Sequence, residues 1–280
     1  MKLLRYGPAG EEKPGLLDQD GTIRDLSSVI DDVNGGTLSP ESIERLSGIE
    51  PGSLPAVTAE ARLGTCVGNI GKLVCIGLNY SDHAKESGMP IPTEPIVFMK
   101  ATSCISGPND DIELLRGSQK TDWEAELGIV IGSHTKYVSE ANALEHVAGY
   151  CVVNDVSERE WQLERQGQWI KGKSGDTYGP IGPWMVTRDE VPDPQALAIW
   201  LEVNGHRYQE GNTATMIFSA RTIVSYLSQC MSLQPGDVIA TGTPPGVGQG
   251  QNPQVFLKTG DVVTLGLDGL GSQQQTVVEA

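Results

Sequence analysis

Short apolar segments that recur at close intervals constrain the fold of this chain most. From about residue 70 onward they are separated by glycine, proline, asparagine or aspartate, and they cover residues 72–78, 95–101, 124–132, 148–156, 197–205, 237–242 and 261–267. Such segments predict β-strands. Few helical patterns lie between them and the alternation is irregular, so the sequence predicts an α+β fold that is mainly β, with antiparallel or mixed sheets.

Turn and helix signals complete this pattern. Expected hairpin turns are Asp20-Gly21, Asn204-Gly205 and Asp268-Gly269, because such dipeptides favour tight two-residue turns. Helices are expected over residues 81–87, 157–167 and 219–230. The second of these begins with Ser157 and Glu160, which have capping-box spacing.

The first part of the chain differs from the rest. The Asp20-Gly21 hairpin indicates a small β-rich unit over about the first 48 residues, and the proline and glycine spacing of residues 48–64 indicates a linker. The sequence therefore predicts a small N-terminal domain with a linker over residues 1–68, and a larger domain that carries the chemistry over residues 69–280.

Composition excludes several classes of partner. A formal net charge of −16 argues against nucleic acid or an anionic membrane, although a small anionic substrate could bind beside a local positive charge. No apolar run approaches the roughly 20 residues that span a bilayer, and the apolar stretch at the N-terminus is too short for a signal peptide. The five cysteines form no CxxC pair. We expect a cytoplasmic protein without a disulfide framework or zinc site.

Paired carboxylates mark one predicted strand. Glu124 and Glu126 are two residues apart and share a face, where like charges are unfavourable without a cation between them. Asp155 ends another predicted strand, and three carboxylates suit a hard cation. Gly128 continues the glutamate face and is expected to leave room for a ligand. The spacing is equally compatible with two glutamates on the solvated face of an edge strand.

Other polar residues have more than one interpretation. His83 and Glu86 share a face of the short helix, which suits a general base and the group that orients it, but also an ordinary exposed helix. Lys171 and Lys173 lie in a glycine-rich segment that could bind a small anion or form a surface turn. The segment TGTPPGVGQG lacks the GK[ST] ending of a phosphate loop.

Taken together, six segments resemble the fumarylacetoacetate hydrolase family. They are CIGLNYSDHAKE, DWEAELGIVIG, VVNDVSEREWQ, GKSGDTYGPIGPW, EGNTATMIFS and GDVIATGTPPGVG, which occur in the family's order and cover residues 70–280. The resemblance implies a mixed β-sandwich roll with a small N-terminal β-rich domain, assembled as a homodimer or a dimer of dimers.

The resemblance also implies roles for individual residues. Its metal ligands match Glu124, Glu126 and Asp155, with Mg²⁺ as the expected ion and Mn²⁺ or Ca²⁺ in some members. Its catalytic residues match His83, Glu86 and Lys173, with the first two on a segment that acts as a lid, and its substrate-binding residues match Gln162 and Thr243. The roles of Arg159 and Lys171 stay open.

The implied activity is metal-dependent hydrolysis of the C3–C4 bond of a 2,4-diketo acid, which yields pyruvate and a second acid. The chain is most similar to hydrolases of 2,4-diketo-3-deoxy-L-rhamnonate or its L-fuconate isomer. Acylpyruvate hydrolysis or oxaloacetate decarboxylation at the same site are the alternatives, and a non-catalytic metal-binding protein is a further one.

Overall fold

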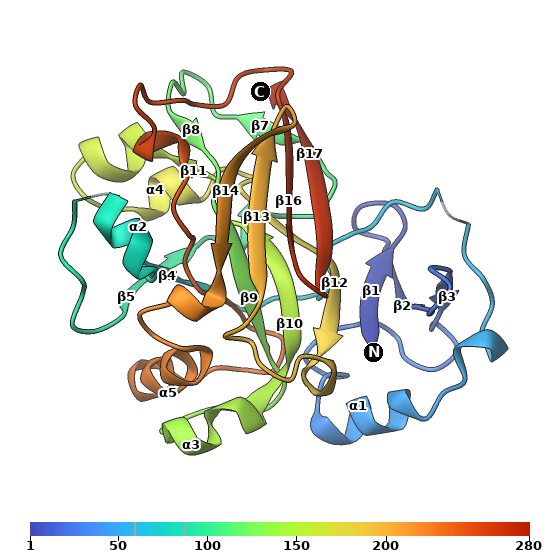
Figure 1. Cartoon of the computed structure of the whole chain (residues 1–280). Coiled ribbons are helices and arrows are strands. Elements are labelled where there is room, and N and C mark those ends of the chain that lie inside the picture. The colour runs from blue at the N-terminus through green and yellow to red at the C-terminus, as the bar shows by residue number, and fades with distance from the viewer. Residues whose placement is uncertain (59, 87) are drawn as a thin grey trace.

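Strands dominate the computed structural model, which describes every residue except 59 and 87 (Figure 1). Within the described residues, the larger sheet has ten strands in the order β3-β2-β1-β12-β10-β9-β15-β4-β5, with β6 paired to β12. Its strands are β1 (Lys2–Tyr6), β2 (Lys13–Leu17), β3 (Ile23–Asp25), β4 (Leu73–Gly77), β5 (Ile96–Lys100), β6 (Ile105–Ser106), β9 (Ala125–Ile131), β10 (Val147–Asn154), β12 (Gly179–Thr187) and β15 (Val238–Ala240).

A second sheet of five strands packs against the middle of the first. Its order is β14-β13-β16-β17-β7, and β13, β16 and β17 contact β9, β10 and β12 across the interface. Its strands are β7 (Ile112–Leu114), β13 (Ala198–Val203), β14 (His206–Asn212), β16 (Val262–Leu267) and β17 (Gly271–Glu279), and a separate pair is formed by β8 (Thr121–Asp122) and β11 (Ser157–Glu158). These mixed, mainly β sheets confirm the predicted fold class.

Helices are short and lie around the sheets (Figure 1). They are α1 (Pro40–Ser47), α2 (Ser81–Glu86), α3 (Glu140–Ala143), α4 (Ile170–Lys173) and α5 (Ala220–Cys230), with a π-helical turn at Glu160–Glu164 and 3₁₀ turns at Pro51–Ser53, Thr102–Cys104, Leu144–His146, Arg188–Glu190, Thr213–Thr215 and Gly248–Gly250. In the described part of the chain, no helix is long and apolar enough to cross a membrane.

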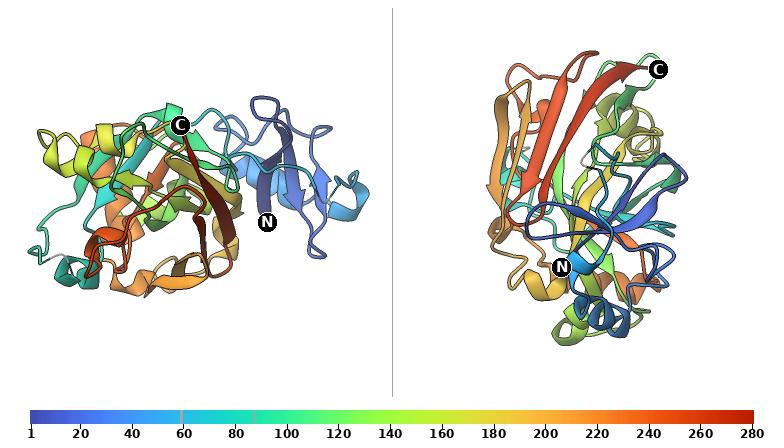
Figure 2. Two further views of the ribbon diagram at one scale, coloured as in Figure 1. Left: turned by 90° about the horizontal axis from the view of Figure 1, so that it is seen from above. Right: turned by 90° about the vertical axis from the view of Figure 1, so that its right-hand side faces the viewer.

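The N-terminal strands extend the larger sheet. The predicted hairpin of β2 and β3 forms, but residues 18–22 join the strands in place of a two-residue turn at Asp20-Gly21. Strand β1 pairs with β12 through Leu3 and Met185. Seen from above, this segment projects to one side of the remaining chain (Figure 2, left). Hydrogen bonds therefore join residues 1–68 to the rest, while the domain boundary itself stays a prediction. Residue 59 of the predicted linker lies outside the described residues.

The predicted helix over residues 157–167 is wrong at its start. Ser157 pairs with Asp122 in the β11–β8 bridge, and its hydroxyl donates to the carbonyl of Asp155. Glu158 caps the following turn instead, because its carboxylate accepts from the N–H of Trp161 at 2.7 Å. The turn is π-helical and ends at Glu164. The predicted helix over 81–87 forms through Glu86, and residue 87 lies outside the described residues.

Candidate active site

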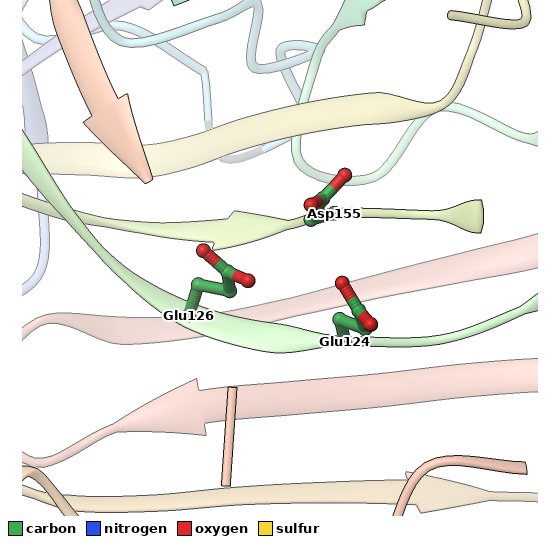
Figure 3. A group of neighbouring side chains, drawn as sticks. All are labelled: Glu124, Glu126 and Asp155. Carbon is green, nitrogen blue, oxygen red and sulfur yellow. The ribbon is translucent and has the colours of Figure 1, made fainter. Parts of the chain in front are cut away.

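Two central strands bring the three predicted metal carboxylates together. In the antiparallel register of β9 and β10, Glu126 faces Val153, and the N–H of Asp155 donates to the carbonyl of Glu124 at 2.9 Å. Asp155 therefore lies opposite Glu124, on the face that Glu126 also uses. Figure 3 shows the three carboxylates directed into one space. One oxygen from each lies within 4.8 Å of the others, and all three residues are buried.

This burial decides between the two interpretations of the paired glutamates. All residues of β9 are buried, because β10 and β15 flank it and the second sheet covers it. The interpretation that the two glutamates lie on the solvated face of an edge strand is therefore wrong. The space expected at Gly128 is also wrong, since a Cβ there would lie 2.7 Å from Cys151 Sγ and 2.8 Å from Val153 Cγ2. Gly128 allows close packing between β9 and β10 and leaves no room for a ligand.

Two of the three carboxylates are paired with basic side chains. Lys173 Nζ lies 2.6 Å from Glu124 Oε2 and 2.7 Å from Asp155 Oδ2. Arg159 reaches Glu124 Oε1 at 2.8 Å, and Lys100 Nζ reaches Asp155 Oδ1 at 2.5 Å. The described contacts thus place three basic groups beside Glu124 and Asp155 and none beside Glu126, and buried charges of opposite sign stabilise each other when they are paired in this way.

The pKa values of the cluster follow from this pairing. Burial alone raises the pKa of Glu124, but Arg159 and Lys173 outweigh it and hold the pKa well below its usual range. For Glu126, burial and then the charges of Asp155 and Glu124 raise the pKa well above its usual value. Burial lowers the pKa of Lys173, but Asp155 and Glu124 raise it overall. Glu126 is therefore the carboxylate for which a further cation would relieve the largest unfavourable charge.

The donor set fits a divalent metal ion. All three groups offer carboxylate oxygens, one from each within 4.8 Å of the others, and such all-oxygen ligation suits a hard cation. Carboxylate oxygens have lone pairs enough to accept a hydrogen bond and also bind a cation. The residues that would hold the ion are Glu124, Glu126 and Asp155, as predicted.

A cavity of about 430 Å³ opens onto the carboxylates, and all of the predicted site residues line it. Besides the three carboxylates, these are His83, Glu86, Gln162, Lys173 and Thr243. Strands, the π-helical turn, α2 and the loop after β15 all contribute to the same space. The structure thus brings the predicted residues together, while the role of each stays a prediction.

His83 and Glu86 face the cavity from α2. His83 Nδ1 lies 3.0 Å from Glu86 Oε2, and the other carboxylate oxygen accepts from the N–H of Gly246 at 3.0 Å. Glu86 therefore fixes the imidazole from one side and is itself fixed by the loop after β15. With the Nδ1 proton directed at Glu86, Nε2 is the nitrogen that can accept a proton.

The loop after β15, which contains the segment TGTPPGVGQG (residues 241–250), binds carboxylates of the protein. Its backbone N–H groups donate to Glu126 from Gly242, to Glu86 from Gly246, and to Asp122 from Gly248 and Gln249. Thr243 donates its hydroxyl to the carbonyl of Ala125 at 2.8 Å and accepts from Gln209. Its hydroxyl therefore anchors β9, which leaves less capacity for a substrate.

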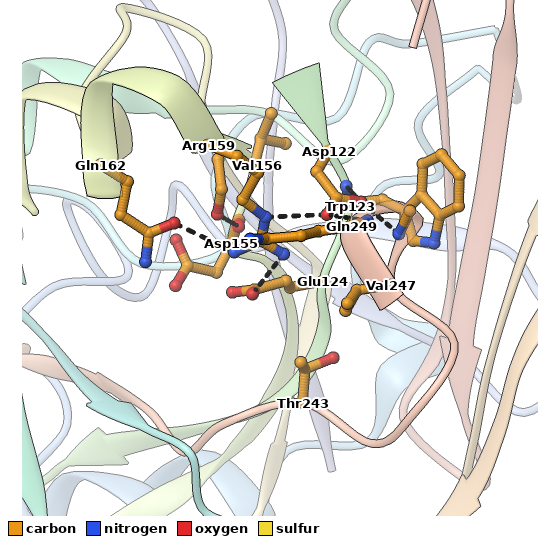
Figure 4. A network of polar contacts seen from close by, with 12 residues as sticks. Asp122, Trp123, Glu124, Asp155, Val156, Arg159, Gln162, Thr243, Val247 and Gln249 are labelled. Atoms are coloured by element: carbon orange, nitrogen blue, oxygen red, sulfur yellow. Dashed lines mark hydrogen bonds and ion pairs between the residues drawn. The ribbon is translucent and has the colours of Figure 1, made fainter. Parts of the chain in front are cut away.

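Gln162 and Lys173 reach the cavity through close packing of two helical turns. A Cβ at Gly172 would lie 2.4 Å from the backbone nitrogen of Gln162 and 2.5 Å from the carbonyl of Glu158, so glycine lets α4 rest on the π-helical turn. Lys173 is buried there, whereas Lys171 is exposed and does not line the cavity. Arg159 donates to the amide oxygen of Gln162 at 3.1 Å, which turns the amide nitrogen away from Arg159 (Figure 4).

Three charged residues of the site were not predicted. Arg159 bridges Glu124 and the fully buried Asp122, and Lys100 lies beneath Asp155, where it also donates to the carbonyl of Val156 (Figure 4 shows the arginine network). In the sequence, Lys100 ends the apolar segment that forms β5, and a lysine that is buried in the structure requires an anion nearby.

Comparison with known proteins decides the family. Residues 72–278 match the fumarylacetoacetate (FAA) hydrolase C-terminal family. The chain belongs to this family. A relative from Burkholderia lata, named "Putative hydrolase", is 64% identical over 281 residues, which is 100% of each chain. These similarities support an enzyme of the family and confirm the resemblance seen in the six segments.

Solved structures of the family share the fold over nearly the whole chain. A fumarylacetoacetate hydrolase from Exiguobacterium antarcticum is 35% identical with a TM-score of 0.87, covering 100% of both chains. A 2-hydroxyhepta-2,4-diene-1,7-dioate isomerase from Mycobacterium marinum is 32% identical with a TM-score of 0.75, covering 100% of this chain and 98% of the other. Maleylpyruvate hydrolase from Sphingobium sp. SYK-6, in complex with manganese(II) and pyruvate, is 27% identical with a TM-score of 0.84, covering 100% of both chains.

Proposed function

We propose that this protein is a divalent-metal-dependent hydrolase that cleaves the C3–C4 bond of a 2,4-diketo acid. The observation that carries the proposal is one cavity in which a His–Glu pair faces three buried carboxylates suited to a hard cation. The manganese and pyruvate in the Sphingobium structure support the same pairing of ion and product class.

His83 has the geometry of a general base. Its Nε2 is free of the Glu86 contact, so it would take a proton from water as the water oxygen bonds to C4. The C3–C4 bond then breaks with its electron pair on C3, and the imidazolium returns the proton there to give pyruvate and a carboxylic acid. Glu86 holds the ring in position and stabilises the imidazolium that forms, which lowers the barrier to proton transfer.

The other residues would bind the acidic end of the substrate. A bound cation would supply positive charge where the departing three-carbon fragment becomes negative. Lys173 is buried beside Glu124 and Asp155 and would add a fixed positive charge there, while the amide nitrogen of Gln162 and the backbone at Thr243 would orient the substrate carboxylate. The ion itself we propose to be Mg²⁺, with Mn²⁺ or Ca²⁺ as alternatives.

Within this class, we propose 2,4-diketo-3-deoxy-L-rhamnonate or its L-fuconate isomer as substrate, with pyruvate and lactate as products. The experiment measures pyruvate from both sugar acids beside acetylpyruvate, each with EDTA and with Mg²⁺ restored. Mg²⁺-dependent pyruvate from the sugar acids is the expected result. Turnover of acetylpyruvate alone would retain the hydrolase and contradict the sugar-acid assignment, and no turnover of any would contradict the hydrolase.

A second candidate reaction uses the same residues without breaking the C3–C4 bond. The similarity to the Mycobacterium marinum isomerase favours it, since proton transfer by a His–Glu pair beside a metal also suits the isomerisation of an unsaturated 2-oxo acid. Oxaloacetate decarboxylation is the remaining alternative. Following the ultraviolet spectrum of a 2-hydroxydienoate, and carbon dioxide from oxaloacetate, in the same assays distinguishes these reactions.

A further inference from the structure

Part of the cavity wall is apolar. The apolar side chains in it include Leu78, Met89, Ile96, Phe98, Leu163 and Trp169, and the Phe98 ring centroid lies 5.0 Å from Lys173 Nζ. Phe98 and Trp169 meet edge to face with their ring centroids 5.2 Å apart, and a Cβ at Gly77 would lie 2.7 Å from the Trp169 ring. Phe98 and Trp169 are therefore held by packing, and together with the partly exposed aliphatic side chains they form an apolar wall.

Every basic group that lines the cavity is already paired. Among the described lining residues these are Lys173, which contacts Glu124 and Asp155, Arg159, which contacts Asp122 and Glu124, and His83, which contacts Glu86. The uncharged polar side chains of the far side include Gln249 and Gln254. A cation bound to the carboxylates would bind the 2-oxo acid end. Lys173 Nζ lies 5.0 Å from the Phe98 ring centroid but is already paired with two carboxylates, so the described lining residues offer no unpaired positive charge for a second anion.

We propose that the acyl group beyond C4 of the substrate is uncharged and ends in an apolar group, and that Leu163 is a residue that selects it. This inference rests on the proposed function, because it takes the 2-oxo acid end to lie on the carboxylate side. A tail that ends in a second carboxylate would lose part of its hydration against Phe98, Trp169 and Leu163, without an unpaired positive charge among the described lining residues. A lactoyl or simple acyl tail meets no such cost.

The test measures binding, so that it does not depend on turnover. Two 2-oxo acids of matched shape are titrated calorimetrically into protein saturated with Mn²⁺: 2-oxoglutarate, and 5-methyl-2-oxohexanoate, in which an isopropyl group replaces the distal carboxylate. Pyruvate, which has no tail, is the reference. We expect 5-methyl-2-oxohexanoate to bind at least about tenfold more tightly than 2-oxoglutarate, because only the latter buries an unpaired charge.

A pair of variants tests the selecting residue. Leu163 is 43% exposed on the π-helical turn, so a polar side chain there should be compatible with folding. Leu163→Lys should tighten 2-oxoglutarate binding at least about fivefold, by supplying the missing charge, and leave pyruvate binding unchanged. Leu163→Gln, which introduces a polar but neutral side chain, should not tighten 2-oxoglutarate binding.

The outcomes separate the two proposals. If pyruvate and the isopropyl compound bind but 2-oxoglutarate binds as tightly or more tightly, the uncharged tail is wrong and the proposed function stands. If none of the three binds to the Mn²⁺ protein, binding of a 2-oxo acid at the metal is wrong, and the inference falls with it. If Leu163→Lys leaves 2-oxoglutarate binding unchanged, Leu163 does not select the tail.

Discussion

Two regions of the cavity are built in different ways. Glu126 lies in β9, and Glu124 and Asp155 directly precede β9 and follow β10, in the middle of the larger sheet. The Asp155 side chain is 1% exposed there, and each acid has cations or backbone N–H groups beside it. His83 and Glu86 come from a six-residue helix near the sheet edge, with side chains 12% and 21% exposed. The candidate metal site is thus part of the core and the proposed base is peripheral. Substitutions in the first should change metal affinity and stability, and those in the second should change turnover alone.

Glu126→Gln should have the largest effect. It removes one of the three oxygen anions while keeping an acceptor for the N–H of Gly242. We expect kcat/KM for the diketo acid to fall by at least about 10³-fold and metal affinity by at least about 10²-fold. Without metal, stability should be unchanged or higher, because a carboxylate crowded by Asp155 and Glu124 is unfavourable when buried. Metal titration and urea unfolding in EDTA check this, and destabilisation in EDTA would contradict it.

His83→Gln should separate turnover from binding. Loss of a general base costs roughly 10²–10⁴-fold in kcat. The Mn²⁺ dissociation constant should stay within about twofold of the wild-type value, because no contact joins His83 to the three carboxylates in the described structure. The free energy of unfolding should be unchanged for the same reason. The matched control is Lys171→Gln, an exposed position that does not line the cavity, which should change neither. A fall in metal affinity with His83→Gln would mean that the two regions are coupled.

Sequence patterns predicted this difference only in part. The seven apolar segments predicted β4, β5, β9, β10 and β15 of the larger sheet and β13 and β16 of the second. The antiparallel return from β9 to β10 places Asp155 opposite Glu124. Spacing could not decide whether Glu124 and Glu126 face solvent, since that depends on β15 and the second sheet covering β9. The contact of Glu86 with Gly246, 160 residues later in the chain, could not be predicted from local pattern either.

Some elements were missed although a signal was present. Helix α1 has Ser39 as its N-cap, Pro40 in its first turn and Gly48 after its end, all standard helix limits. Strand β12 was taken for part of a glycine-rich segment, because Gly179, Pro180, Gly182 and Pro183 disfavour a strand locally, yet pairing with both β1 and β10 overrides that preference. Tertiary pairing outweighed composition in this case.

Lys100→Met should connect stability to the metal. Lys100 is fully buried and paired with Asp155, and removing one partner of a buried pair costs roughly 3–5 kcal/mol, at the lower end here because Lys173 still contacts Asp155. We expect the free energy of unfolding to fall by about 3 kcal/mol in EDTA and by less with saturating Mn²⁺, which would take over the neutralising role. Lys72→Met removes the partner of Asp237 and should destabilise equally with and without metal. An equal loss for Lys100→Met in both conditions would show that Lys100 serves the core rather than the metal site.

The smallest expected effect is the release of a proton from Glu126 when a metal ion binds to the carboxylates. The pKa of Glu126 is raised by burial and by Asp155 and Glu124, so the metal-free protein keeps a proton there that a metal ligand must lose. Metal affinity should therefore fall as the pH falls below that raised pKa, by at most about tenfold per pH unit. The stability of the metal-free protein should depend on pH in the opposite direction. Folded Glu126 keeps a proton that the unfolded chain releases near pH 4.5, so the free energy of unfolding decreases as the pH rises from about 4.5 through the raised pKa of Glu126. Calorimetry of Mn²⁺ binding in buffers of different ionisation enthalpy counts the protons, and Glu126→Gln should release none. If His83→Gln abolished the release instead, the proton would belong to the peripheral base and the division between the two regions would be wrong.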